Sequence, residues 1–521
     1  MKIKTLPLAA VLLAVAFVAT TAPAQTTVTS TNAAPASTAT PRAIWRFDEF
    51  TKLVTSPPGY PINWGGDMRV RNEYFNNGLS LSSNPQFSPL FGPVHEQEVL
   101  RFRGRLWATL FPTNDISLTV RLTAEPREFL KQSTYDTFFD SSGMQWRYGI
   151  FDNLYLRWKS PLGTPSTLTV GRQDILLGDG WLVAQGSPEV GSFYYYFDAA
   201  RLTCNLEKQH TTIDAIGIYQ LARPDGWLPT LGPSGTVPGD PNALLSTSQN
   251  EEGAILWVAN KSIPAANVDG FFIYKHDAQI DRPPLSLYGD DAEMYTIGGC
   301  LSGLPEDHWK YSVEGAYQFG RKRDPNLDQG GDNAELTTSS AQTTGYRHLD
   351  AYAGQSKLTY LCKDEWNDQL SLSFEYLSGD KASTKNDEMF DILWGRWPQW
   401  SEMYNIYSYV PETRVGQTAD LVRFGPTWAV TPAKKLDFSL SYYALWAPQD
   451  VPTRALGAPV FAQDSFSDSG DFRGHYLQAI LKYKFNDYVS AHLWSEFLWE
   501  GNFYAKQQMM DFLRAEVLFT F

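Results

Sequence analysis

Alternation of apolar and polar side chains, repeated in short stretches along most of the chain, constrains the fold more than any other feature. In residues 101–110 the three arginines occupy odd-numbered positions, and most even-numbered positions are apolar. Successive side chains of a β-strand point to opposite faces, so this stretch has one polar and one apolar face. The same alternation predicts strands at 118–125, 154–159, 370–376, 477–485 and 513–521, whereas 213–219 and 268–274 are too apolar for their faces to be assigned.

The connections between the predicted strands alternate in length. Eight short links are predicted at 111–115, 160–166, 206–210, 261–267, 303–308, 362–368, 431–435 and 486–487. Nine long stretches, rich in Gly, Pro, Asp and Asn, lie at 76–95, 127–147, 174–197, 222–251, 277–292, 321–347, 379–420, 448–473 and 500–509. With a first strand near 66–74, this pattern predicts eighteen antiparallel strands.

The outward-facing apolar residues indicate contact with lipid. No segment beyond the N-terminus has the roughly 20 consecutive apolar residues that a membrane helix needs, so the strands would have to span lipid as a closed barrel in which every backbone group is paired. Aromatic residues make up 14% of the chain, and several lie near strand ends, as in a membrane-interface belt. The predicted fold class is all-β, a single closed antiparallel transmembrane β-barrel of about 18 strands with short periplasmic turns and long extracellular loops.

The N-terminal residues resemble a targeting segment. Lys2 and Lys4 precede a nearly unbroken apolar run at 6–18, and Ala22 and Ala24 supply the small residues that signal peptidase requires. We therefore predict a cleaved signal peptide at 1–24, a flexible Ser/Thr/Ala/Pro tether at 25–43, and one outer-membrane barrel domain at 44–521. This order predicts export across the inner membrane and insertion in the outer membrane.

Composition excludes several classes of function. The net charge of −14 argues against nucleic acid as a partner, because phosphates would be repelled. Most of the seven histidines lie singly in loops or turns, and no Cys or His pair has metal-site spacing. No recognisable nucleophile motif accompanies them. We expect a protein that is not an enzyme and has no cofactor and no metal; the alternative from the enzyme class is an outer-membrane hydrolase.

The polar faces of the first four strands and of the last one carry the candidate substrate-binding residues. Consecutive antiparallel strands are neighbours, and closure places the last strand beside the first, so these side chains would form one basic wall. In a narrow lumen such charges are weakly screened and act together on a permeating anion. The alternative is a structural ladder in which the cations face lumenal carboxylates, with Glu125, Glu314, Glu375, Asp437, Glu496 and Glu516 as available partners. The candidates are Arg69, Arg71, Arg101, Arg103, Arg105, Arg121, Arg157, Lys159 and Arg514.

Three groups of motifs resemble those of the bacterial alginate-export outer-membrane proteins. The first consists of VGRQD at 170–174, LGDGWL at 177–182 and FDAARL at 197–202. The second is EYLSGD at 375–380 with FD at 390–391, and the third joins GH at 474–475 to GNFY at 501–504. The resemblance implies an eighteen-stranded barrel with an electropositive lumen that conducts an anionic polyuronate outward. One departure is the acidic and aromatic stretch 387–400, which is not typical of a polyanion site.

The first motif contributes its own candidate residues. Arg172, Asp174, Asp179, Asp198 and Arg201 are candidate lumen or constriction residues. Gly178-Asp179-Gly180 has an alternative interpretation as a tight turn, because glycine tolerates positive φ and aspartate caps its own turn. The long segment 174–197 either folds inward as a constriction or lies outside the barrel.

These observations together predict a passive outer-membrane channel of alginate-export type. The expected partners are an anionic polysaccharide or related saccharide solute, outer-membrane lipid and lipopolysaccharide, and periplasmic export proteins. The alternative within the channel class is a substrate-specific uptake porin for small anionic or sugar solutes. Long loops without obvious interface strands favour a monomer.

Overall fold

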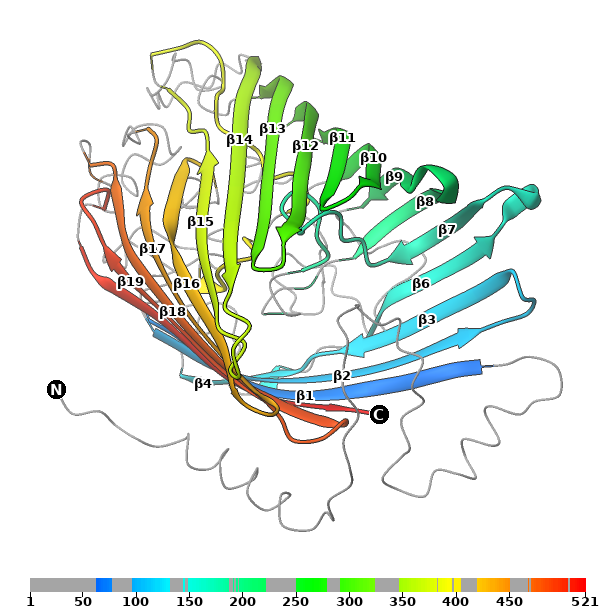
Figure 1. Ribbon diagram of the computed structural model, residues 1–521, viewed down its shortest axis with the longest axis horizontal. Coiled ribbons are helices and arrows are strands. Elements are labelled where there is room, and N and C mark those ends of the chain that lie inside the picture. Colours follow the sequence, from blue (N-terminus) through cyan, green and yellow to red (C-terminus); the bar gives the residue numbers. More distant parts are fainter. Residues whose placement is uncertain are drawn as a thin grey trace.

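The fold is a ring of tilted antiparallel strands, seen in a computed structural model (Figure 1). The structure describes residues 62–76, 96–131, 144–145, 149–186, 191, 194, 196–221, 250–278, 291–323, 346–381, 383–395, 398–403, 419–449, 467, 470–504 and 507–521. Within these ranges no helix is long and apolar enough to cross a membrane. The predicted signal peptide and tether lie outside the described residues.

Twenty strand elements and two single 3-10 turns make up the ring. The first half contains β1 (Ile62–Asn76), β2 (Glu96–Leu110), β3 (Ile116–Ala124), β4 (Arg127–Lys131), β5 (Met144–Gln145), β6 (Ile150–Lys159), η1 (Pro161–Gly163), β7 (Ser166–Gln173), β8 (Phe197–Leu206), η2 (Glu207–Gln209), β9 (Thr211–Gln220) and β10 (Glu251–Ile263). The second half contains β11 (Ala266–Asp277), β12 (Ala292–Glu306), β13 (Trp309–Arg323), β14 (Tyr346–Leu361), β15 (Gln369–Leu377), β16 (Leu421–Ala433), β17 (Leu436–Trp446), β18 (Phe472–Lys484), β19 (Val489–Glu500) and β20 (Met509–Thr520).

These elements form eighteen strands, because two strands are interrupted. Both β3 and β4 pair with β2, and they are separated only by Glu125 and Pro126. Proline has no backbone N–H, which explains a break in the ladder at this point. On the next strand, β5 pairs with β4 and β6 pairs with β3. The predicted count of eighteen antiparallel strands is confirmed.

The sheet closes between its first and last strands. β1 pairs with β2 along one edge and with β20 along the other, from Asp67↔Thr520 to Asn76↔Asp511. The eight short connections join strand ends on the side of the barrel where Ile62 faces Leu110, and the strand ends that the nine long connections join lie on the opposite side. We call these the turn end and the loop end; in outer-membrane barrels they face the periplasm and the exterior.

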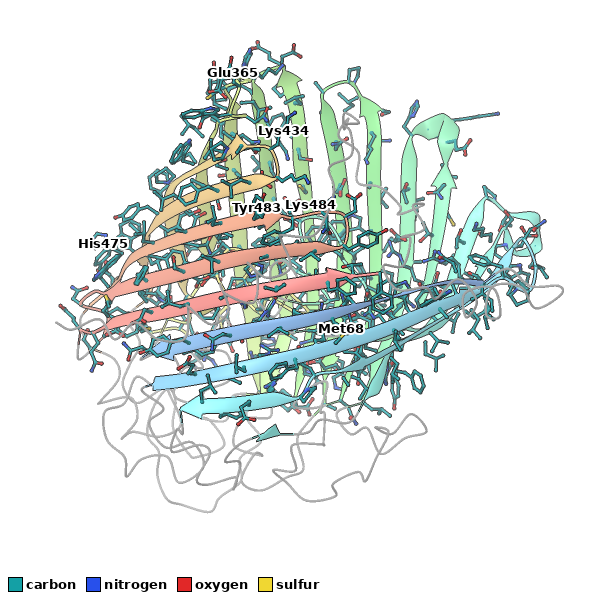
Figure 2. All side chains as sticks on the ribbon, turned by 90° about the horizontal axis from the view of Figure 1, so that it is seen from below. Met68, Glu365, Lys434, His475, Tyr483 and Lys484 are labelled. Carbon is teal, nitrogen blue, oxygen red and sulfur yellow. The ribbon has the colours of Figure 1, made fainter. Side chains whose placement is uncertain are left out.

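The wall is apolar outside and polar inside where the sequence predicted alternation. On β1, Met68 and Val70 are 61% and 46% exposed, whereas Arg69 and Arg71 are 3% and 0% exposed. The outer face continues around the barrel through side chains such as Tyr483 on β18; Figure 2 labels Met68 and Tyr483 on it. Lipid would cover these side chains, so their exposure is the property expected of a membrane-facing surface.

The inner face of β9, β10, β11 and β12 departs from the polar interior expected of a barrel. Ile216, Ile255, Ile273 and Met294 are buried there in a hydrophobic core that lies within the ring. Residues 213–219 and 268–274 could not be assigned faces from sequence because both sides of these strands are apolar: one side faces lipid, and the other packs on chain inserted into the lumen.

Candidate functional site

Six of the candidate arginines lie buried in two ion-pair clusters on adjoining strands. Arg69 and Arg71 on β1, three arginines on β2 and Arg514 on β20 face inward. Of these, only the side chain of Arg105 is more than a tenth exposed, at 15%. The sequence therefore predicted their common face correctly, because the register places β20, β1 and β2 side by side.

Carboxylates from the same strands hold these guanidinium groups. Arg71 donates from Nε to Glu516 Oε2 at 2.6 Å and from Nη1 to Glu73 Oε1 at 3.2 Å. Arg101 donates to the other oxygen of Glu73 at 2.8 Å and also pairs with Glu125, which accepts from Arg69 as well.

The second cluster lies toward the turn end and is centred on Asp67. Its Oδ1 accepts from Arg103 Nη2 at 3.0 Å, and its Oδ2 accepts from Arg105 Nε at 2.6 Å. Arg121 on β3 forms a third cluster, in which it donates to Asp152 at 2.8 Å and to Asp174 at 3.0 Å. Eight arginines thus meet seven carboxylates, because Arg127 on β4 also lies 3.6 Å from Glu125; the carboxylates are Asp67, Glu73, Glu125, Asp152, Asp174, Glu402 and Glu516. Most of the positive charge on this part of the wall is therefore neutralised.

Arg157 and Lys159, the other two candidates, lie outside these clusters. Both are exposed on the inner face of β6, near the turn end, where Arg157 lies 5.5 Å from the ring centroid of Tyr155. Across the lumen, Lys310 on β13 and Lys357 on β14 are also exposed and face inward, since they pair beside buried Thr359 and part-buried Ser312. Neither lysine was predicted, because both lie outside the first four strands and the last. The alternation of Lys310 with Trp309 and Tyr311 is the sequence signal that indicates its inward face.

The residues of the first motif divide between the two faces of the wall. Arg172 shares the outer face with Val170 and Leu156, and it donates to Asp198 at 2.8 Å and 3.0 Å. Arg172 and Asp198 therefore do not line the lumen, which corrects the prediction for this pair. The physical reason is register: Arg172 lies an even number of positions from Val170, which is 44% exposed to lipid.

The other motif residues face inward. Arg201 pairs with Asp214 at 2.8 Å, and Asp174 accepts from Arg121 and from Asn153. Asp179 is exposed at the tip of a turn in which Gly180 N donates to Leu177 O at 3.0 Å. The φ angles of Gly178 and Gly180 are 56° and 79°, so the two glycines adopt the left-handed conformation that a tight turn requires.

Two inserts fold into the ring and pack against each other. The β7–β8 insert (residues 174–186) and the β15–β16 insert (residues 378–403) both lie among the strands in Figure 1. Ile175, Leu182 and Val183 of the first insert join the apolar core formed by β9 to β12. The segment 174–186 therefore folds inward, which decides between the two alternatives left open by the sequence.

A short backbone bridge joins the two inserts. Trp394 N donates to Leu182 O at 3.0 Å, and Ala184 N donates to Trp394 O at 3.3 Å. The Trp181 ring stacks on Phe390 with centroids 5.9 Å apart. Gly395 lies so close that an added Cβ would come within 1.8 Å of Trp181 O. The inserts thus form one packed unit across the lumen.

Three lumenal carboxylates attach this unit to the wall. Glu375 on β15 accepts from Trp181 Nε1 at 3.0 Å, and Glu251 on β10 accepts from Trp394 Nε1 at 2.9 Å. Glu496 on β19 accepts from Ser401 Oγ and from the backbone N–H groups of residues 402 and 403, each at 2.8 Å. Glu375 and Glu496 had been considered as partners for the basic wall. Instead, Glu375 pairs with Arg423 at 3.0 Å, and both carboxylates hold the inserts.

At its start, the β15–β16 insert is fixed by a two-point ion pair. Arg347 on β14 donates to both oxygens of Asp380, at 2.7 Å and 2.8 Å. Burial raises the pKa of the Asp380 carboxyl above its ordinary value, although Arg347 opposes this effect. The described residues of 387–400, a stretch that did not suggest a polyanion site, thus belong to the packed insert, in which Phe390, Trp394 and Trp400 make ring contacts.

A family model described as alginate export matches residues 247–517, just over half of the chain. The chain belongs to the alginate export family. This confirms the resemblance inferred from the motifs, although the matched range contains only the second and third groups; the first group, at 170–202, lies outside it. No curated protein matches the chain.

Solved structures share the fold of this alginate export family member. The crystal structure of OccAB1 from Acinetobacter baumannii has a TM-score of 0.51 at 11% sequence identity, covering 88% of this chain and 96% of that chain. OccK2 (OpdF) from Pseudomonas aeruginosa has a TM-score of 0.50 at 11% identity, covering 88% and 97%. At this identity the likeness establishes the barrel architecture alone. Family and fold together make the chain an outer-membrane β-barrel channel.

Proposed function

We propose that this channel passes an anionic saccharide, either a polysaccharide or a shorter uronate, through a lumen whose accessible positive charges lie toward the turn end. The observation that carries the proposal is the exposure of Arg157, Lys159, Lys310 and Lys357 on inner faces across the barrel. Exposed cations on facing walls would attract an anion from either side, and several weak sites allow it to leave again.

In this proposal the seven paired candidate arginines have a different role from the exposed cations. Each has a carboxylate partner, so the wall of Arg69, Arg71, Arg101, Arg103, Arg105, Arg121 and Arg514 presents little net charge to a solute. We assign these residues chiefly to holding the wall and one insert. Of the motif residues, Asp174 pairs with Arg121 and Arg201 pairs with Asp214, so we assign both to the wall as well. Asp179 is a candidate constriction residue because its side chain is exposed.

A second candidate is a substrate-specific uptake porin for small anionic or sugar solutes. The packed unit of the two inserts favours it, because chain that fills part of the lumen narrows the passage available to a polymer. Both candidates share the same anion-attracting inner face, and they differ in the length of saccharide that passes.

Flux through proteoliposomes containing the full chain tests the proposal. Galacturonate should enter several-fold faster than neutral galactose, and the Lys310→Gln/Lys357→Gln double variant should lose most of that difference. Lys363→Gln, in a turn and paired with Asp307, is the matched control and should behave as wild type. Equal flux of the acid and the neutral sugar would contradict the proposal.

The same assay separates the two candidates by chain length. Trigalacturonate passing at a rate near that of the monomer would support a polysaccharide conduit, whereas its exclusion would support the small-solute porin.

We also retain the predicted processing and partners as proposals. Residues 1–24 would be removed before insertion, and 25–43 would tether the barrel domain; N-terminal sequencing of protein extracted from outer membranes checks the first point. Lipid, lipopolysaccharide and periplasmic export proteins are the proposed partners at the outer face and the turn end.

A further inference from the structure

A buried lysine on β11 lies between two carboxylates where the inserts attach to the wall. Lys275 Nζ is 3.0 Å from Asp277 Oδ2 and 3.8 Å from Glu251 Oε1, and all three residues are buried. Glu251 also accepts the hydrogen bond from Trp394 Nε1, and Lys275 Nζ lies 5.8 Å from the centroid of the same ring system. One lysine therefore contacts both the wall carboxylates and the tryptophan that attaches the insert.

The carboxyl group of Asp277 is only partly satisfied. Its Oδ2 accepts from Lys275 Nζ, whereas its Oδ1 is buried and has no hydrogen-bond partner. A buried carboxylate oxygen without a donor destabilises the charged form, because the oxygen has lost water and gained no bond in return. Burial accordingly raises the pKa of the Asp277 carboxyl to about 6; Lys275 opposes this effect. The nearby carboxylates of Glu251 and Asp391 add to it.

Asp277 faces the insert, at a level above the lipid hydrocarbon. It is the last residue of β11, at the loop end, and the insert residue Asp391, which interacts with it, lies 3.8 Å from Lys322 on β13. On the outer face at the same level, His276 lies 3.6 Å from Asp291, so the wall is polar there on both sides. Because the loop end of such a barrel faces the exterior, Asp277 is placed to respond to the external pH.

We propose that Asp277 is a proton-operated latch for the insert unit: with its proton it keeps Trp394 on Glu251, and without it the insert moves off the wall and the lumen widens. The physical cause is competition for Lys275. When Asp277 is ionised, two buried carboxylates share one ammonium group, and their hydration requires Trp394 to leave. The strands cannot move instead, because β10 and β11 are paired on both edges. This inference goes beyond the proposed function and does not depend on which solute passes.

The latch should close in acid and open toward neutral pH. Asp277 binds its proton more tightly in the attached state, where its pKa is about 6, than in the hydrated state, where the ordinary value is 3.8. Attachment is therefore fully favoured below about pH 4 and is weakened as the pH rises through about 6. Between about pH 5.0 and about pH 7.5, the ratio of detached to attached inserts should rise about tenfold.

Single-channel recording of the full chain at these two pH values tests the latch. In wild type, the time spent at the high-conductance level relative to the low level should be about ten times greater at the higher pH. Asp277→Asn cannot ionise and should keep the low, acid-like ratio at both pH values. Glu252→Gln, an exposed position on the outer face of the same hairpin, is the control and should match wild type.

A second variant keeps the test decisive if Asp277→Asn folds poorly. Glu251→Gln can still accept from Trp394 Nε1 through its amide oxygen, and it leaves Lys275 to Asp277 alone. It should therefore also keep the low ratio at both pH values. The proposal is overturned if the wild-type ratio is independent of pH or rises in acid, or if a folded variant at position 277 or 251 keeps the wild-type pH dependence.

Discussion

At the residue scale, the lumenal arginines and lysines divide into two groups, one buried and paired with carboxylates and one exposed to the lumen. Arg71 is fully buried between Glu73 and Glu516, whereas Lys357 is exposed on the inner face of β14. The sequence predicted the inward face of the arginines, since alternation alone decides it. It could not predict which were neutralised, because partners such as Arg71 and Glu516 lie 445 positions apart and meet only through the closing register.

Arg71→Ala should destabilise the barrel strongly. The substitution leaves Glu516 and Glu73 buried without one of their cations, and removing one partner of a buried pair typically costs about 3–5 kcal/mol. Urea unfolding of the refolded protein in detergent measures this loss. Lys357→Gln, which removes an exposed charge, should leave the unfolding free energy unchanged, so an equal loss in both variants would contradict the division into two groups.

At the element scale, the strands follow from the sequence and the inserts do not. Each of the eight short and nine long connections has a counterpart in the prediction, because local alternation and turn residues set most of them. The bounds of one were wrong: β4 (Arg127–Lys131) and β5 (Met144–Gln145) lie within the predicted loop 127–147, since Pro126 interrupts the alternation. The inward course of the two inserts depends instead on distant contacts, such as Trp394 with Glu251 and Trp181 with Glu375. No local sequence pattern in 174–186 or 378–403 indicates that these tryptophans contact carboxylates on distant strands. The glycine turn at 178–180 is the one part of the inserts whose conformation local chemistry does indicate.

The attachment of the inserts to the wall leads to a prediction about Gly253 on β10. A Cβ at this position would lie 2.2 Å from the Trp394 ring and 2.5 Å from Tyr274 O, so alanine must displace one of them. Gly253→Ala should loosen the insert unit and raise single-channel conductance while the barrel still folds. Gly217→Ala on β9, where nothing lies within 4 Å of the added atom, is the control. Identical conductance in the two variants would show that Trp394 does not hold the constriction.

At the scale of the whole molecule, closure creates an asymmetric lumen. Pairing of β1 with β20 brings the paired arginine wall together on one side. The inserts pack on the apolar inner faces of β9 to β12, and exposed cations remain near the turn end. Eighteen strands, with apolar side chains outside and polar ones inside, could be deduced from the sequence. The division of the lumen into a paired arginine wall, an insert-filled side and a region of exposed cations could not, because it depends on contacts between residues far apart in the chain.

The reversal potential across a planar bilayer under a KCl gradient tests the central claim, that exposed cations near the turn end make the lumen attract anions. The account predicts chloride preference in wild type. It also predicts loss of most of that preference when Arg157, Lys159, Lys310 and Lys357 are all replaced by glutamine. A wild-type channel that prefers potassium, or a quadruple variant with unchanged selectivity, would contradict it.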